Sequence, residues 1–306
     1  MRIAFVTTLA EIARKNKWVM LLTGDLGFSV FEKFMAELPR QFLNMGVAEQ
    51  NMTGVAAGLA MEGKIPIIFS IVPFATMRNF EQIRNDICYQ NLNVKIVGVG
   101  AGFSYGPYGH THHGLEDMGI LRTLPNLVIL APGDPLEVKL ATRAMLKYRG
   151  PVYLRLGKAG EPNVHLVAPI FTIGRGIVIR EGKDISLLAT STLLYRGREV
   201  ADSLENRGVK VRLVSMPTLK PLDGELIKEC VKKTRAIFTL EEHSVIGGLG
   251  SAVAEALAEY GKPVIFKRLG VPDRFTKVIG NQEYMRRANQ LAAEQIVVTI
   301  RKAIAK

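Results

Sequence analysis

The stretch that decides the fold runs from Ile65 to Val99 and reads IPIIFSIVPFATMRNFEQIRNDICYQNLNVKIVGV. Short apolar runs rich in β-branched residues open and close it, at Ile65–Phe69 and Val94–Val99. Between them, Asn79–Tyr89 carries its apolar residues at helical spacing. A strand, a helix and a second strand in this order predict a βαβ unit with parallel strands.

This alternation continues in both directions along the chain. The other strands and helices predicted in the first half are Trp18–Thr23, Phe42–Met45, Glu49–Glu62, Leu127–Ala131, Pro135–Lys147 and Val152–Leu156. After a stretch with Gly, Pro and little periodicity, the pattern restarts with Ile185–Ala189, Leu193–Asn206, Val209–Val214, Leu222–Lys232, Ala236–Leu240, Gly250–Tyr260, Val264–Lys267 and a last helix, Gln282–Ala305. We therefore predict an α/β protein of two consecutive doubly wound, mostly parallel-sheet domains, 1–157 and 176–306, joined by a linker, 158–175.

Composition excludes several classes of protein. The 306 residues include 40 Lys+Arg against 28 Asp+Glu, a formal charge of +12, but the basic residues are scattered and form no nucleic-acid-binding run. The charge fits a phosphorylated metabolite or an acidic partner better. No apolar run is long enough for a membrane span, and the N-terminus does not resemble a secretory signal. The two cysteines form neither a disulfide framework nor a metal clip, so we expect a cytoplasmic protein.

Two segments carry groups that could do chemistry. In GVAEQNM, Gly46–Met52, a glycine turn precedes a helix with Glu49 in its first turn; the alternative is a solvated carboxylate that favours the helix dipole. The loop Gly98–Gly114 holds His110, His112 and His113 after a predicted strand, where ligands of parallel sheets bind. These histidines could be surface residues or could transfer protons; their spacing argues against a metal site.

Two further segments are weaker on their own. Phe74 lies at a strand-to-helix junction, where an aromatic is more often part of the core. The turn GDLGFS, Gly24–Ser29, follows a strand but matches no phosphate-binding glycine motif.

Taken together, these segments resemble a known family. GVAEQNMTGVAAGLAMEGKIPI, FATMRNFEQIRND, GHTHHGLEDMGILRTLPNLVILAPGD and EEHSVIGGLG occur in the order found in thiamine-diphosphate enzymes of the transketolase group. The similarity covers the pyrimidine-binding and C-terminal domains, whereas the diphosphate-binding domain with its GDG…N motif has no counterpart. The chain thus resembles the C-terminal subunit of a split transketolase, which implies transfer of a two-carbon ketol unit from a ketose to an aldose.

The resemblance also implies roles for individual residues. Glu49 would face N1′ of the aminopyrimidine ring and promote loss of the C2 proton of thiamine diphosphate. Phe74 would stack on that ring. The remaining implied cofactor contacts are Ile71 and Asp25, and the implied substrate contacts are His112 (also catalytic, by proton transfer), His110, Ser29, Arg2 and Lys158.

The family pattern places the cofactor between two chains. The implied partner is an N-terminal transketolase subunit that holds the diphosphate and Mg²⁺, so this chain would bind no metal itself. We expect a homodimeric core and an active heterotetramer. The substrate pocket departs from the pattern, because Gly100, Pro107 and Tyr108 stand near positions where the family usually carries polar residues.

Other activities remain open on the sequence. The chain could be the β-subunit of a 2-oxoacid dehydrogenase or a truncated relative of deoxyxylulose-phosphate synthase. The run GHTHHG and the segment LEDMGILRTLPN favour the transketolase group. A catalytically idle subunit that regulates or scaffolds a partner is the third alternative.

Overall fold

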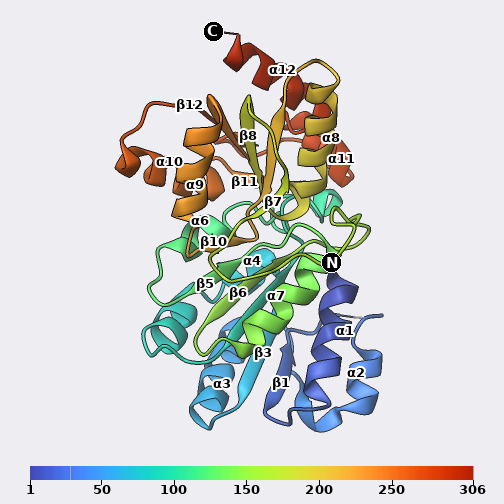
Figure 1. The fold of residues 1–306 in the computed structure, drawn as a ribbon. Coiled ribbons are helices and arrows are strands. Elements are labelled where there is room, and N and C mark those ends of the chain that lie inside the picture. Colours follow the sequence, from blue (N-terminus) through green and yellow to red (C-terminus); the bar gives the residue numbers. More distant parts are fainter. Residues whose placement is uncertain (28, 306) are drawn as a thin grey trace.

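The computed structural model describes residues 1–27 and 29–305. It contains one sheet of seven strands and one of five, each packed against helices (Figure 1). The predicted class, two consecutive mostly parallel α/β units, is confirmed. Within the described residues, no helix is both long and apolar enough to cross a bilayer.

The first sheet has the strand order β10-β5-β6-β4-β3-β1-β2, and all of its strands are parallel except β10. Strands β1, β4 and β6 are buried along their whole length, which is why the sequence shows continuous apolar runs there rather than alternation. The strands are β1 (Val19–Thr23), β2 (Phe42–Asn44), β3 (Ile65–Ile71), β4 (Lys95–Val99), β5 (Val128–Leu130), β6 (Val152–Leu156) and β10 (Thr218–Lys220).

Helices cover this sheet and return the chain from one strand to the next. The predicted helix Asn79–Tyr89 begins as α5 and continues as a π-helical segment, η2. The first helix, α1, was not predicted. The helical elements are α1 (Arg2–Ala13), α2 (Glu32–Glu37), η1 (Pro39–Gln41), α3 (Glu49–Met61), α4 (Val72–Thr76), α5 (Phe80–Gln82), η2 (Ile83–Cys88), η3 (Gly106–Tyr108), α6 (Asp117–Arg122) and α7 (Pro135–Lys147).

The second sheet has the order β12-β11-β8-β9-β7, with β7 antiparallel at its edge. The prediction of one last helix, Gln282–Ala305, is wrong. The chain forms α11 and α12 instead, because Gln290 takes a left-handed backbone conformation between them, with φ of 65°. The elements are β7 (Ile177–Arg180), β8 (Ile185–Ala189), η4 (Ser191–Leu193), α8 (Leu194–Glu205), β9 (Val211–Ser215), α9 (Gly224–Lys233), β11 (Ala236–Ser244), α10 (Leu249–Tyr260), β12 (Ile265–Val271), α11 (Gln282–Ala288) and α12 (Ala293–Ile304).

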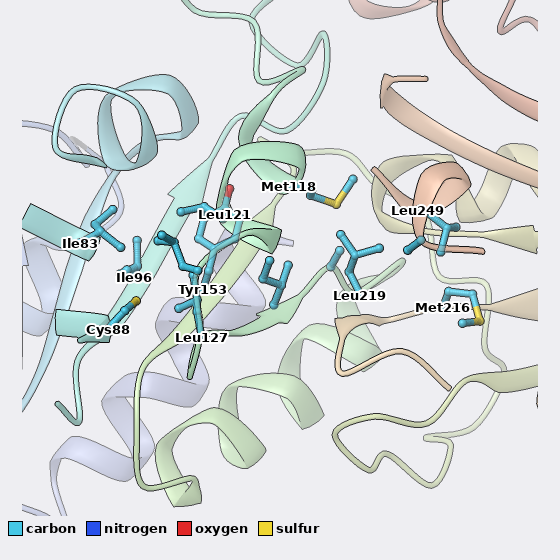
Figure 2. Close-up of a cluster of buried hydrophobic side chains, with 14 of the residues drawn as sticks. Ile83, Cys88, Ile96, Met118, Leu121, Leu127, Tyr153, Met216, Leu219 and Leu249 are labelled. Atoms are coloured by element: carbon cyan, nitrogen blue, oxygen red, sulfur yellow. The ribbon is translucent and has the colours of Figure 1, made fainter. Parts of the chain in front are cut away.

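The two units share both a strand and a core. Strand β10 follows β9 in the chain but pairs antiparallel with β5 of the first sheet. Figure 2 shows the buried cluster that continues across this junction, with Met118 and Leu219 between the side chains of the first unit and Met216 and Leu249 of the second. The boundary at residues 158–175 remains a prediction. Because β10 lies beyond this linker but pairs within the first sheet, the linker does not divide the two units completely.

Candidate active site

The carboxyl edge of the first sheet gathers every site residue that the sequence predicted. Most of them follow the ends of β1, β2, β3, β4 or β6. Arg2 precedes β1, but α1 leads into the start of β1, so the first turn of α1 lies at the carboxyl edge as well. The chain passes from β1 to β2 on one side of β1 and then to β3 on the other side. The carboxyl ends of the neighbouring strands β1 and β3 therefore form a topological switch point.

Glu49 lies at this switch point. Its side chain is 1% exposed, and it begins α3 after β2. Ser70 of β3 donates to Glu49 Oε1 at 3.0 Å. A Cβ at Gly24, just beyond β1, would lie only 3.3 Å from the same oxygen, so glycine there lets the backbone approach the carboxylate closely.

Arg78 links Glu49 to the ring of Phe74. Arg78 Nη1 donates to Glu49 Oε2 at 2.7 Å, while the Arg78 guanidinium carbon lies 4.2 Å from the centre of the Phe74 ring. Phe74 is half-buried on α4, and Ile71 ends the strand that precedes it. A buried carboxylate, a planar cation and an aromatic face therefore form one cluster, which we call the edge cluster: Glu49, Ser70, Phe74 and Arg78.

His112 contacts Phe74 and begins a row of contacting side chains, which we call the row: His112, Tyr108, Tyr105 and Lys158. The rings of His112 and Phe74 meet edge to face, with centroids 5.2 Å apart. Tyr105 and Tyr108 also contact the His112 ring, at centroid distances of 6.3 and 5.3 Å. Thr111 Oγ1 lies 3.0 Å from His112 Nδ1, which leaves Nε2 as the ring nitrogen available to a ligand.

Two cations lie beyond Tyr105. Lys158 Nζ is 4.8 Å from the centre of the Tyr105 ring. Burial raises the pKa of the Tyr105 phenol, and the nearby charge of Arg2 opposes that rise. A Cβ at Gly100 would lie 2.3 Å from the Tyr105 ring, so this ring fills the space that a side chain at position 100 would need. The far end of the row is therefore aromatic and positively charged.

Asp25 and Ser29 lie on the exposed loop after β1. Asp25 pairs with Asn44 at the end of β2: Asn44 Oδ1 accepts from the Asp25 amide at 3.1 Å, and Asn44 Nδ2 donates to Asp25 Oδ1 at 3.0 Å. Ser29 is exposed, and its amide donates to Glu32. These two residues share the edge of the sheet with Glu49 but make none of the contacts of the edge cluster.

The three histidines of the loop separate rather than converge. His110 contacts Phe275 of the second unit, with ring centroids 5.6 Å apart. His113 is buried against Phe103, and its Nε2 lies 3.3 Å from the Gly106 carbonyl oxygen. Among the residues that the structure describes, no group of three or more His, Cys, Asp or Glu could hold a metal ion.

The second unit holds this loop in place. Glu242 of β11 accepts from the Phe103 amide at 2.8 Å and from Arg286 at 2.7 Å. Burial alone would raise the pKa of Glu242, but the Arg286 cation holds that pKa below its usual value. His243 Nε2 accepts from the Gly119 amide of α6 at 3.2 Å. The EEHSVIGGLG motif therefore connects the second unit to the first through hydrogen bonds.

A cavity of about 510 Å³ lies at the opposite edge of the first sheet. Its lining includes Cys88 and Tyr89, which precede β4, and Leu124, which precedes β5. Burial raises the pKa of the Cys88 thiol to about 12, so the thiol stays protonated and unreactive. The other polar side chains of its lining are those of Arg84, Asn85 and Asn126, so this cavity presents no carboxylate or histidine like those of the carboxyl edge.

Two family models account for most of the sequence. The transketolase pyrimidine-binding domain matches residues 1–161, and the transketolase C-terminal domain matches residues 174–296. The chain belongs to the transketolase family. This family depends on thiamine diphosphate, and the match covers its pyrimidine-binding and C-terminal parts.

Relatives of the transketolase family include both split and longer proteins. An apulose-4-phosphate transketolase subunit of Actinobacillus succinogenes is 37% identical over 86% of this chain and 85% of its own. The 6-deoxy-6-sulfo-D-fructose transketolase subunit SqwH of Clostridium sp. (strain MSTE9) is 37% identical over 97% of this chain and 92% of its own. The 1-deoxy-D-xylulose-5-phosphate synthase of Gloeothece citriformis is 36% identical, but the match spans 43% of that protein.

A solved structure agrees along the whole chain. The protein titled "Split gene transketolase, inactive beta4 tetramer" is 40% identical, with a TM-score of 0.91 over 99% of this chain and 98% of its own. The predicted resemblance to the C-terminal subunit of a split transketolase is therefore confirmed.

Sequence reasoning missed three members of the site: Ser70, Arg78 and Tyr105. Arg78 stands within the segment FATMRNFEQIRND, but it lies beyond the last residue of α4, so no helical spacing links it to Phe74. Nothing in the sequence marks Ser70 or Tyr105, because their contacts depend on how strand ends and loops meet in space.

Proposed function

We propose that this chain is the subunit of a two-chain transketolase that supplies the catalytic glutamate and the aminopyrimidine pocket. The enzyme would move a two-carbon ketol unit from a ketose to an aldose. One observation carries the proposal: the Glu49 carboxylate, 1% exposed, lies at the switch point of a parallel sheet beside the half-buried ring of Phe74. Burial of a carboxylate carries a desolvation cost that its contacts with Ser70 and Arg78 offset, and a carboxylate held in this way at the carboxyl edge of a parallel sheet supports a role in ligand binding.

The residues of the carboxyl edge fit the aminopyrimidine of thiamine diphosphate. Glu49 offers an oxygen that can share a proton with a ring nitrogen, and Phe74 offers an aromatic face beside it. Ile71 and Asp25 would complete the pocket from the ends of β3 and β1. When bound, thiamine diphosphate supplies a nucleophilic carbon that can attack a ketose carbonyl.

The row beyond Phe74 fits a sugar substrate. His112, with Nδ1 next to Thr111, would hold or move a proton at a substrate hydroxyl. His110 and Ser29 would contact the sugar from the exposed loops. Lys158 contacts the Tyr105 ring, and the charge of Arg2 opposes the rise in the pKa of the Tyr105 phenol, so both cations lie near this ring. They would suit a phosphate at the far end of the sugar.

The proposal requires a second chain. An N-terminal transketolase subunit would hold the diphosphate and Mg²⁺, and two copies of each chain would form the active heterotetramer. Exposed apolar side chains at the same edge as Glu49 support a partner surface there: Ile3 is 73% exposed, Val47 73% and Tyr108 63%. The names of the relatives, which describe them as transketolase subunits, support it as well.

A deoxyxylulose-phosphate-synthase-like reaction is the second candidate, since relatives with that name are 33–36% identical to the chain. Such an enzyme uses a 2-oxoacid donor where a transketolase uses a ketose. Offering the reconstituted complex a ketose or pyruvate as donor separates the two reactions.

The test is a ketose–aldose exchange assay on the chain reconstituted with its N-terminal partner. Glu49→Gln should lower kcat by at least about 10³-fold, because proton sharing with the cofactor ring is lost. The exposed Glu62, at the other end of α3, provides the control, and Glu62→Gln should leave the rate unchanged. A Glu49→Gln rate within a few-fold of the wild-type rate would contradict the proposal.

A further inference from the structure

Arg78 contacts both residues that the proposed function assigns to the cofactor ring. Its Nη1 lies 2.7 Å from Glu49 Oε2, and its guanidinium carbon lies 4.2 Å from the centre of the Phe74 ring. Glu49 Oε1 accepts from Ser70, so both carboxylate oxygens have a partner. Neither the family match nor the names of the relatives assigns a role to Arg78.

The guanidinium and a protonated aminopyrimidine offer the same chemistry to this pocket. Both are planar and cationic, both donate N–H bonds from one edge, and both can stack on an aromatic face. Glu49 and Phe74 present one carboxylate oxygen and one ring to such a group. Arg78 already uses these two surfaces.

We propose that Arg78 is an internal stand-in for the aminopyrimidine ring in the free subunit, and that the cofactor displaces it. This inference rests on the proposed function of Glu49 and Phe74. Paired with Arg78, the buried carboxylate keeps its charge balanced before assembly, which avoids the penalty of an isolated buried ion. The same pairing must be broken before a ring nitrogen reaches Glu49 Oε2.

The exchange requires Arg78 to leave Glu49 toward solvent, and the two side chains differ in exposure in the direction that this requires. Its side chain is 42% exposed, whereas that of Glu49 is 1% exposed. Arg78 lies in the turn after α4, whose last residue is Thr76; its amide donates to the Pro73 carbonyl at 3.4 Å, so the backbone is held while the side chain reaches solvent. The arginine can therefore move toward solvent while the glutamate stays in place. A chain that must displace Arg78 binds its cofactor less tightly than one with an open pocket.

The deciding variant is Arg78→Met, which removes the cation and its hydrogen bond to Glu49 and keeps a flexible side chain of similar length. In the complex with the N-terminal subunit, calorimetry with thiamine diphosphate and Mg²⁺ should give a Kd about 10-fold lower than that of the wild type. Arg84→Met is the matched control, because Arg84 is exposed and donates only to Asn85 among the described residues. Its Kd should equal that of the wild type.

The free chain provides a measurement that does not involve the cofactor. Arg78→Met should lower the unfolding midpoint, because Glu49 loses its cationic partner. In a Glu49→Gln background, the same change should lower the midpoint much less, because an amide needs no cation. Equal decreases in both backgrounds would overturn the pairing role.

The outcomes for the two proposals differ. If the wild-type complex binds no thiamine diphosphate, the proposed function fails, and the stand-in role fails with it. If the wild type binds and Arg78→Met binds equally or more weakly, only the stand-in role is overturned, because Arg78 then assists the bound state instead of competing with it.

Discussion

Two regions of the molecule pair a buried carboxylate with an arginine at almost the same distance. In the edge cluster, Arg78 lies 2.7 Å from Glu49; at the junction of the two units, Arg155 lies 2.8 Å from Asp117. They differ in access to solvent, since Arg78 is 42% exposed and Arg155 is fully buried. An ion pair with one exposed partner can open for a ligand, whereas an enclosed pair serves to position its surroundings.

The enclosed pair shows what that positioning involves. Arg155 donates to Ser191 Oγ at 3.0 Å, to the Gly114 carbonyl at 2.6 Å and to the Glu242 carbonyl at 3.1 Å. It therefore connects β6, the end of the histidine loop and β11 of the second unit. We expect this pair to determine stability and the edge pair to determine function.

The largest expected effect on stability is that of Asp117→Asn. The change leaves Arg155 as a buried cation without a carboxylate, and Tyr153, which donates to Asp117 at 2.6 Å, loses a charged acceptor. Breaking a buried pair from one side costs about 3–5 kcal/mol, so denaturant unfolding should show a loss of that size. Glu49→Gln in the same assay should lose no more than about 1 kcal/mol, since a partly exposed pair contributes less. Equal losses would remove the distinction between the two regions.

A smaller effect concerns the pH dependence of the junction. Burial lowers the pKa of His243 from 6.5 to about 4, so the folded protein keeps this ring neutral while the unfolded chain protonates it below 6.5. Its bonds agree, since Nε2 accepts from Gly119 and Nδ1 lies 2.8 Å from the Ser244 carbonyl. The contribution to stability is present above pH 6.5 and is lost as the pH falls to 4, by about 2 kcal/mol at pH 4.5. His243→Asn should lack this loss in unfolding measurements at pH 6.5 and 4.5.

The pKa of Glu241 shifts in the opposite direction, and its effect on stability provides a second test of the pH dependence. Burial raises its pKa from 4.5 to about 7, against the hydrogen bonds from the Gly250 and Leu249 amides. Its contribution to stability is full below pH 4.5 and is lost as the pH rises through 7. Glu241→Gln should therefore make the acid-induced loss of stability steeper than in the wild type. If both variants follow the wild-type pH profile, neither group titrates as the structure implies.

The fold could largely be predicted from the sequence because the central strands of both sheets are buried on both faces. Continuous apolar runs such as Ile65–Phe69 and Val94–Val99 indicate such strands whatever surrounds them. Helix α1 was missed because Arg2–Ala13 contains several β-branched residues, which are weak helix formers. Strand β10 has three residues, and only the neighbouring β5 makes it a strand.

The candidate site was predictable only in part, because some of its residues lie within local motifs and others depend on contacts between distant segments. Glu49, Phe74 and His112 lie within motifs at strand ends, where a parallel sheet gathers ligand contacts. Arg78, Ser70 and Tyr105 act through distances that no local pattern encodes. The hydrogen bond from the Phe103 amide to Glu242 of the second unit likewise depends on how the two sheets pack against each other.

The smallest effect is expected at the outer end of the row, at Lys158. The side chain is half-buried and contacts the Tyr105 ring at 4.8 Å, so its removal should change stability by less than about 0.5 kcal/mol. Under the proposed function it binds a substrate phosphate in the ground state and the transition state alike. Lys158→Ala should then raise KM for a phosphorylated ketose about 10-fold and leave kcat nearly unchanged, while an unphosphorylated ketose shows no change in KM. Lys158→Arg should restore KM, because it keeps the charge. A decrease in kcat for both ketoses would instead place Lys158 with the edge cluster, among the residues that act on the reacting atoms.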